Sequence, residues 1–437
     1  MAVKLKLNIV LGAVALSFAI SAPATETIKE TIKIGVSGPY TGGSFPMGIS
    51  MRDGIRMAAS EINAQGGVLG RRIELVERDD QAKPERGVAV TQTLINKDKV
   101  VATLGFVNTG VALASQKYYQ QAKIPVLTSV ACGSAITRQF LPPEHPDNYV
   151  FRFSANDTVQ ARMIVEEAVT RRGFKKLAIF ADTTSYGQGG RADLEKALAD
   201  KGIQAVAVEK FDIKDTDMMP QLQRAKAAGA EAILTYGIGP ELAQIATQRV
   251  KLSWNVPMIG SWTLSMDNFI ENAGPFAEGA MMPQTFVQEA DTPKRKAFLE
   301  AYQKVYTTAL RLRKTDGKAL GTVERIPSPV AAAQGYDSMY VLVAAIKQAG
   351  NTNGTKIREA LENLRERIDG VVMTYDRPFS HDNHEAVQIH NVVMGKVKEG
   401  LVAHAYDGDR QAARAVQTGQ FSAPSSPRGS TIPVSKR

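Results

Sequence analysis

Short apolar runs and longer amphipathic stretches alternate along most of the chain. Runs rich in Val and Ile, such as 32–37 and 177–181, are followed by stretches in which apolar residues recur every three or four positions, such as 50–64 and 240–250. The first pattern predicts buried strands, and the second predicts helices with one apolar face. Regular alternation of the two is typical of an α/β fold built on parallel sheets.

Eight candidate strands fall into two sets of four, separated by an irregular stretch at 140–157. The predicted strands are 32–37, 73–79, 100–105, 125–129, 177–181, 205–209, 232–236 and 257–260. Each set is large enough for one doubly wound domain. We therefore predict two Rossmann-like lobes with a cleft between them, and we expect the site among the loops that follow the strands.

The second half of the chain changes character twice. Helical patterns at 293–306, 331–348 and 355–364 precede a hairpin-like region at 371–406, and we expect these segments to complete the lobes. Beyond Gly408 the sequence is polar and rich in Ser and Pro, with too few apolar residues to offset the entropy of ordering. We predict a disordered tail at 409–437.

The N-terminus has the pattern of a secretory signal peptide. Lys4 and Lys6 precede an apolar run at 9–20, and the small residues Ala22 and Ala24 follow it. About a dozen apolar residues are fewer than the ~20 of a membrane-spanning helix. We predict that residues 1–24 are removed. No cysteine follows them that could take a lipid anchor, so we expect a periplasmic protein without an anchor.

Composition excludes several classes of function. The formal charge of +9 includes Lys4 and Lys6 and is otherwise spread along the chain. Nucleic-acid binding normally shows a basic stripe with residues that contact bases, and we find neither. Cys132 is the single cysteine, so no intramolecular disulfide can form and a packed core must provide the stability.

Two local motifs have ordinary structural explanations. Gly237 and Gly239 follow a predicted strand as in a dinucleotide-binding loop, but Leu242 stands where the third glycine is needed. His381 and His384 have a spacing that binds zinc on a helix, but here we interpret them as part of a polar turn. Because no third ligand is evident, we predict no metal.

Catalytic machinery is also not evident. No serine lies in a Gly-x-Ser-x-Gly elbow, and the histidines do not pair with a nucleophile. We interpret Cys132 as a small buried apolar residue. Asn156, Asp157 and Thr158 match a glycosylation acceptor, but they equally make a helix start, which we favour. We therefore expect neither an enzyme nor a bound cofactor.

Several motifs together resemble the leucine/isoleucine/valine-binding family, which has the type I periplasmic binding protein fold. They are Ile32 to Gly42, Ala58 to Gly67, Asp79-Asp80, Ile124-Pro125-Val126, Tyr186-Gly187 and Glu278-Gly279. The resemblance spans about 32–406, nearly the whole chain after the signal peptide. It implies two doubly wound lobes joined by a hinge of three crossovers, near Phe151, Pro283 and Tyr375. Lobe 1 would then comprise 25–151 plus 284–375, and lobe 2 would comprise 152–283 plus 376–408.

The resemblance also implies partners and ligand-binding residues. The partners are the permease subunits and ATPases of an ABC importer, and we expect the binding protein to be a monomer. By position, Asn108 and Thr109 with the backbone of 131–133 (Ala131, Cys132, Gly133) would hold a ligand carboxylate. Tyr186 would close from lobe 2, and Phe45 and Met47 would wall in the ligand side chain. Helix N-termini near these loops favour an anion independently of the resemblance.

Two departures from the family pattern concern the ligand. Ile238 stands where amino-acid binders have an aromatic residue, and Trp262 stands where they have an acidic residue for the ligand ammonium. An ammonium would lose that partner, and an indole face suits a flat apolar group. We therefore expect an aromatic or other carboxylic acid. An alternative is a sensor that presents its ligand to a signalling receptor, which a neighbouring kinase gene instead of permease genes would favour.

Overall fold

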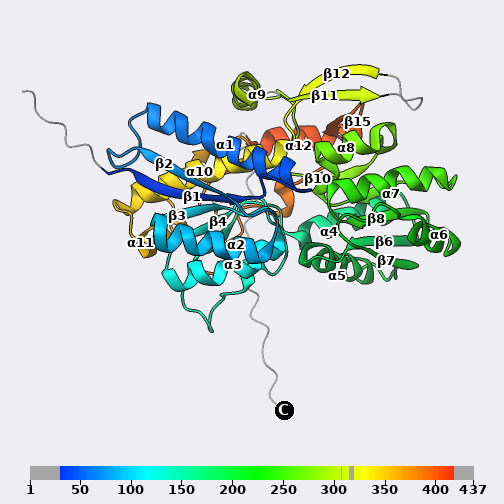
Figure 1. The fold of residues 1–437 in the computed structure, drawn as a ribbon, viewed down its shortest axis with the longest axis horizontal. Helices are drawn as coiled ribbons and strands as arrows, with labels where there is room; N and C mark the ends of the chain where they lie inside the picture. Colours follow the sequence, from blue (N-terminus) through cyan, green and yellow to red (C-terminus); the bar gives the residue numbers. More distant parts are fainter. Residues whose placement is uncertain (1–29, 307, 314–318, 418–437) are drawn as a thin grey trace, which may run out of the picture.

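The computed structural model describes residues 30–306, 308–313 and 319–417. Their strands form two large sheets that lie side by side along the long axis of the molecule (Figure 1). Helices pack against each sheet, so the predicted architecture of two α/β lobes is confirmed. The predicted signal peptide at 1–24 lies outside the described residues.

Lobe 1 is built on a parallel five-stranded sheet in the order β2-β1-β3-β4-β5. The strands are β1 (Ile32–Gly38), β2 (Ile73–Asp79), β3 (Ala102–Gly105), β4 (Val126–Thr128) and β5 (Val150–Arg152). The helices are α1 (Phe45–Ala64), α2 (Pro84–Thr93), α3 (Thr109–Ala122), α9 (Pro293–Tyr306), α10 (Pro329–Ala349) and α11 (Gly354–Glu362). Helix α1 packs along α10 and α2 packs along α3, so both faces of the sheet are covered (Figure 1). Double coverage explains why the central strands are continuous apolar runs.

Lobe 2 is built on a seven-stranded sheet in the order β16-β15-β10-β9-β8-β6-β7. The strands are β6 (Leu177–Asp182), β7 (Ala207–Phe211), β8 (Ala232–Tyr236), β9 (Met258–Gly260), β10 (Met281–Gln284), β15 (Val393–Lys398) and β16 (Leu401–His404). The helices are α4 (Asp157–Val165), α5 (Ser185–Ala199), α6 (Met219–Ala227), α7 (Gly239–Lys251) and α8 (Asp267–Ala273). Strands β6 to β10 are parallel, whereas β15 and β16 add an antiparallel edge.

The chain passes between the lobes three times. It leaves lobe 1 between β5 and α4, returns between β10 and α9, and leaves again between β14 (Thr374–Tyr375) and β15. Strand β14 pairs with β13 (Ile368–Asp369), and a hairpin of β11 (Thr308–Arg313) and β12 (Ala319–Arg325) projects beyond the two main sheets (Figure 1). Three crossovers make a hinge region of separate chain segments, as the family resemblance implies.

Two expectations need correction. The stretch 140–157 is not wholly irregular, because Val150–Arg152 forms β5 at the edge of the lobe 1 sheet. The tail does not begin at 409, because Asp407–Gln417 forms helix α12. This helix is docked, since Asp409 Oδ2 accepts a hydrogen bond from the Met394 N–H at 3.2 Å, and Arg410 Nε donates to Glu289 Oε2 at 2.8 Å. The rest of the predicted tail, 418–437, lies outside the described residues.

Candidate functional site

The carboxyl ends of the parallel strands in both lobes meet where the lobes touch. The Asn268 side-chain amide of lobe 2 donates to the carbonyl of Gly43 in lobe 1 at 2.8 Å. A Cβ atom placed on Gly110, in the first turn of α3, would lie 3.5 Å from Ser185 Oγ at the start of α5. The loops that the sequence predicts as the site therefore face one another across this junction, and the lobes are in contact there.

The lobe 1 half of the junction contains two adjacent helix N-termini. Asn108 precedes α3 and Ser44 precedes α1, and the Asn108 Nδ2 donates to Ser44 Oγ at 3.0 Å. Neither residue caps its own helix with a side-chain hydrogen bond. Backbone N–H groups at uncapped N-termini favour a negatively charged ligand group. The buried Oδ1 of Asn108 has no hydrogen-bond partner in the described part of the chain.

The loop after β4 packs directly against the start of α3. Thr109 Oγ1 accepts a hydrogen bond from the Gly133 N–H at 3.2 Å, and a Cβ on Gly133 would lie 2.3 Å from the Thr109 Cγ2. Only glycine permits this close approach. Ala131 and Cys132 are buried beside it. The structure thus brings together five residues that were predicted to hold a carboxylate, namely Asn108, Thr109, Ala131, Cys132 and Gly133.

The lobe 2 half is mostly aromatic. The Tyr186 hydroxyl donates to Ser261 Oγ at 2.6 Å, and its ring meets that of Tyr236 edge to face at 5.4 Å. Trp262 is 2 % exposed, and its backbone N–H donates to Gln160 Oε1 at 3.1 Å. Ile238 is buried at the start of α7, where a Cβ on Gly43 of lobe 1 would lie 3.6 Å from its Cγ2.

The two predicted wall residues differ from each other. Met47 is buried in the core on α1, whereas Phe45, the first residue of α1, is 37 % exposed. The exposure of Phe45 is that of the alternative interpretation, in which it is an exposed aromatic residue and not a wall of the ligand site.

Arg152 fixes the geometry of the loop between Cys132 and Gly133. Its guanidinium is fully buried and donates to the carbonyls of these two residues at 2.9 and 2.7 Å. The same group forms a bidentate pair with Glu385, with 2.7 Å between Nε and Oε2. Arg152 is the last residue of β5, directly before the first crossover, and Glu385 lies in the third crossover, so this pair joins two hinge segments beside the predicted site. A pair of this geometry is strong and highly directional.

The family model described as "Periplasmic binding protein" matches residues 31–401. The chain is a periplasmic binding protein. The resemblance to the leucine/isoleucine/valine-binding family is confirmed by relatives such as the "Leucine-, isoleucine-, valine-, threonine-, and alanine-binding protein" of Pseudomonas aeruginosa. That protein is 26 % identical over 334 residues, which are 76 % of this chain and 82 % of the relative.

Solved structures show the same fold. A periplasmic binding protein of Bordetella pertussis has a TM-score of 0.74 at 25 % identity, covering 86 % of this chain and 99 % of that one. The isoleucine complex of a branched-chain amino acid binding protein from Streptococcus pneumoniae has 0.71 at 24 %, covering 85 % and 98 %. A benzoate complex from R. palustris has 0.70 at 21 %, covering 86 % and 96 %. The family and fold are those of extracytoplasmic solute-binding proteins, and no helix of the described ranges is long and apolar enough to cross a membrane.

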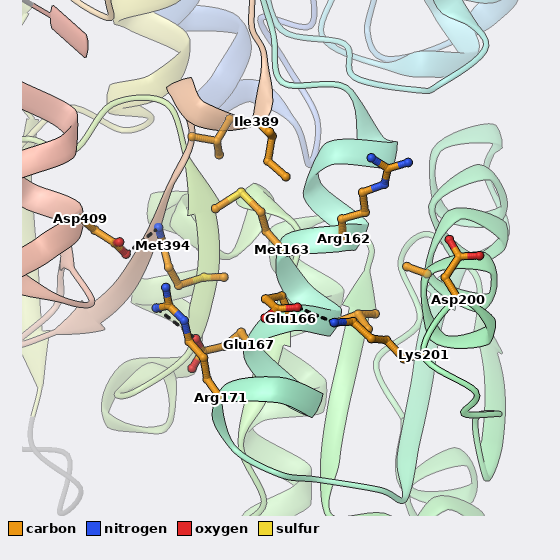
Figure 2. A pocket seen from close by; sticks show the side chains of 13 residues that line it. Arg162, Met163, Glu166, Glu167, Arg171, Asp200, Lys201, Ile389, Met394 and Asp409 are labelled. Carbon is orange, nitrogen blue, oxygen red and sulfur yellow. Dashed lines mark hydrogen bonds and ion pairs between the residues drawn. The ribbon is translucent and has the colours of Figure 1, made fainter. Parts of the chain in front are cut away.

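The binding protein also has a cavity of about 510 Å³ outside the predicted site, on lobe 2 (Figure 2). It lies between α4, the end of α5 and the third crossover, and Met163, Ile389 and Met394 contribute apolar side chains. Its charged side chains largely pair with each other, as Lys201 does with Glu166 at 2.7 Å. None of the ten predicted ligand residues lines this cavity.

The histidine pair of the binding protein has a structural role at His384. This side chain is buried, its Nδ1 lies 2.8 Å from the Val150 carbonyl and its Nε2 lies 3.2 Å from Glu362 Oε1. His381 is exposed. The predicted polar turn is consistent with this arrangement, since Ser380 and Asn383 pair through their backbones.

Sequence analysis missed Arg152, Asp157 and Gln160 as residues of the junction. The sequence presents Asn156 and Asp157 as a glycosylation acceptor or a helix start, and Asn156 is indeed the cap, since its Oδ1 accepts from the Thr158 N–H at 2.9 Å. The available signal was the cluster of polar residues at the predicted change of lobe. Their partners in the tertiary structure could not be deduced from it.

Proposed function

We propose that this binding protein encloses a small carboxylate-bearing ligand between its lobes and delivers it to the permease of an ABC importer. The observation that supports this best is the uncapped start of α3 beside the loop that Arg152 holds in place. Backbone N–H groups and the Thr109 hydroxyl there offer donors to a carboxylate. Relatives and structural neighbours bind isoleucine or benzoate, both of which have a carboxylate.

Tyr186 and Trp262 would enclose the remainder of the ligand from lobe 2. Both side chains are aromatic and buried, and an indole suits a flat or aromatic group through stacking. The preferred ligand is therefore an aromatic or other organic acid. We further propose export through the N-terminal signal peptide, a monomeric state and closure by a hinge at the three crossovers.

A thermal-shift screen tests the ligand class. The purified protein is melted with aromatic carboxylates, aliphatic carboxylates, amino acids and, as controls, sugars and amines that have no carboxylate. A ligand at about 100 times its dissociation constant adds about 2.7 kcal/mol to the free energy of unfolding. At least one carboxylate should raise the melting temperature. Stabilisation by the controls alone would contradict the proposal.

A further inference from the structure

The cavity on lobe 2 has the size and the lining of a small-molecule site. Its volume of about 510 Å³ lies within the range of roughly 300–1,000 Å³ that is usual for ligand pockets. Met163 of α4 and Met394 of β15 contribute to its walls, and Ile389 of the third crossover, 49 % exposed, lies beside them (Figure 2). The remaining apolar lining residues are Val165, Ala197 and Val392. An apolar group placed here would remove this surface from water, which is favourable.

The apolar lining is aliphatic. None of the 13 described residues that line the cavity is aromatic, whereas Tyr186, Tyr236 and Trp262 lie together at the junction of the lobes. Methionine side chains are flexible and adapt to the shape of the group that they contact. A flexible aliphatic chain therefore fits this lining better than a flat ring, which gains most from stacking on another ring.

The wall formed by α4 continues into a π-helix. Residues Glu166–Arg171 follow α4 directly, and Glu166, Glu167 and Arg171 of this segment line the cavity. Segments of π-helix are rare in proteins and occur frequently at functional sites. The backbone of this wall is therefore an independent indication that the cavity binds a ligand.

Four acidic side chains line the cavity, and each already has a partner within the protein. The partners are Lys201 for Glu166, Arg172 for Glu167, Lys196 for Asp200 and the Met394 N–H for Asp409, at 2.7, 2.7, 3.0 and 3.2 Å. A cationic ligand would have to compete with these partners for the carboxylates. The cavity is therefore better suited to a ligand that is neutral or negatively charged.

Arg162 is the lining charge that lacks such a partner. It makes no ion pair or side-chain hydrogen bond with any residue in the described ranges, and Figure 2 shows its guanidinium turned away from Glu166. Of the other lining cations, Lys201 pairs with Glu166, and Arg171 lies over the Tyr406 ring, 4.4 Å from its centre. A guanidinium binds a carboxylate through two parallel hydrogen bonds. Because Arg162 is exposed, a carboxylate beside it would stay partly in water while an attached chain lies in the cavity.

We propose that this cavity is a second ligand site, which binds a small aliphatic carboxylate with its chain against Met163 and Met394 and its charged group beside Arg162. The site is separate from the junction of the lobes and does not depend on the ligand bound there, since none of the predicted ligand residues lines it. It also adjoins the hinge, because Ile389 and Val392 belong to the third crossover.

Octanoate is the probe, and isothermal titration calorimetry measures its affinity for the intact protein. Met163→Glu removes an apolar contact and adds a like charge, so it should weaken octanoate binding about tenfold or more. Val208→Glu is the matched control, because Val208 is an exposed apolar residue on the edge strand β7 and does not line the cavity. This control should bind octanoate as the unmodified protein does.

Arg162→Gln tests the charged end of the site. It should weaken octanoate binding about two- to fivefold, the effect of losing an exposed ion pair. Arg365→Gln, which removes an exposed arginine of lobe 1, should have no effect. Arg162 is itself exposed, so this variant should fold even if Met163→Glu does not.

Hydrogen exchange measured by mass spectrometry locates the bound octanoate. Exchange should slow in 162–171 and 389–394, the two segments that form most of the cavity wall. Slower exchange only in the loops at 108–109 and 131–133 would place octanoate between the lobes and overturn the proposal. An unchanged affinity in both Met163→Glu and Arg162→Gln would also overturn it, as would the absence of octanoate binding to the unmodified protein.

Discussion

Two buried charges at the junction differ in their partners. Arg152 has all its bonds made within the protein, by Glu385 and two loop carbonyls. Asp157 has no ion-pair partner in the part of the chain that the structure describes, and its Oδ2 makes no hydrogen bond of good geometry there, although the Cys132 thiol and the Tyr236 hydroxyl lie close enough to lower its pKa. A satisfied buried ion holds a structure in one geometry, whereas an unsatisfied one lowers the stability of the protein. We interpret Arg152 as a structural residue, and we expect the burial of Asp157 to lower the stability of the protein.

The cost of Asp157 should be measurable without any ligand. Its pKa in the folded state, about 7, is above the ordinary value of an aspartate, so the folded protein retains a proton that the unfolded chain has lost. Stability therefore falls as pH rises from about 4 to 7, by an amount on the order of 4 kcal/mol for this group. Asp157→Asn should melt at a higher temperature than the unmodified protein at pH 8, and the difference should shrink toward pH 5.

Other buried aspartates make the comparison of variants necessary. Burial also raises the pKa of Asp80, Asp182 and Asp337 to about 6, so the unmodified protein alone would show a slope from several groups. Only the difference between the two melting curves isolates Asp157. Parallel curves for the protein and Asp157→Asn across this range would show that Asp157 does not titrate as described.

Helix α12 shows how an element can be missed when composition is averaged over a long segment. The average composition of 409–437 predicts disorder for residues 409–417 because it includes the Ser- and Pro-rich residues that follow them. The helix nevertheless forms, and its contacts are with Met394 in β15 and with Glu289 and Asp291 in the second crossover. It therefore connects the edge of the lobe 2 sheet with a hinge segment.

Shortened variants test the contribution of α12. A variant ending at Tyr406 should melt a few degrees below one ending at Gln417, because exposed ion pairs contribute only ~0.2–1 kcal/mol each. The variant ending at Gln417 should melt at the same temperature as the full chain, because we still predict that residues 418–437 add no stability. Equal melting of both shortened variants would show that the docking of α12 adds no stability.

The elements predicted correctly are those in which consecutive residues are apolar and buried. Strand β6 is buried at each of its six positions, and the sequence alone predicts it at 177–181. Strand β5 is only three residues long and includes a charged residue, Arg152, whose partner Glu385 is 233 residues away. Topology predicts that the site lies in the strand-end loops, but which polar groups meet there depends on such distant contacts.

At the scale of the molecule, the lobes contact each other through pairs such as Asn268 with the Gly43 carbonyl. A ligand can enter the junction only if these contacts separate. We therefore predict two arrangements related by rotation about the crossovers, with ligand favouring the closed one. Small-angle scattering should show a smaller radius of gyration with saturating ligand, and an unchanged radius would refute the hinge.

The order of strands in lobe 2 has a consequence for how the protein matures. Strand β15 follows β10 in the chain by more than a hundred residues, yet it pairs directly with it. Lobe 1 also needs a segment from late in the chain, because α10 packs on α1. A chain that emerges from its N-terminus, from a ribosome or through a translocation pore, completes neither lobe until these late segments are free. Premature compaction is thereby limited, and the last strand to appear completes the sheet of lobe 2.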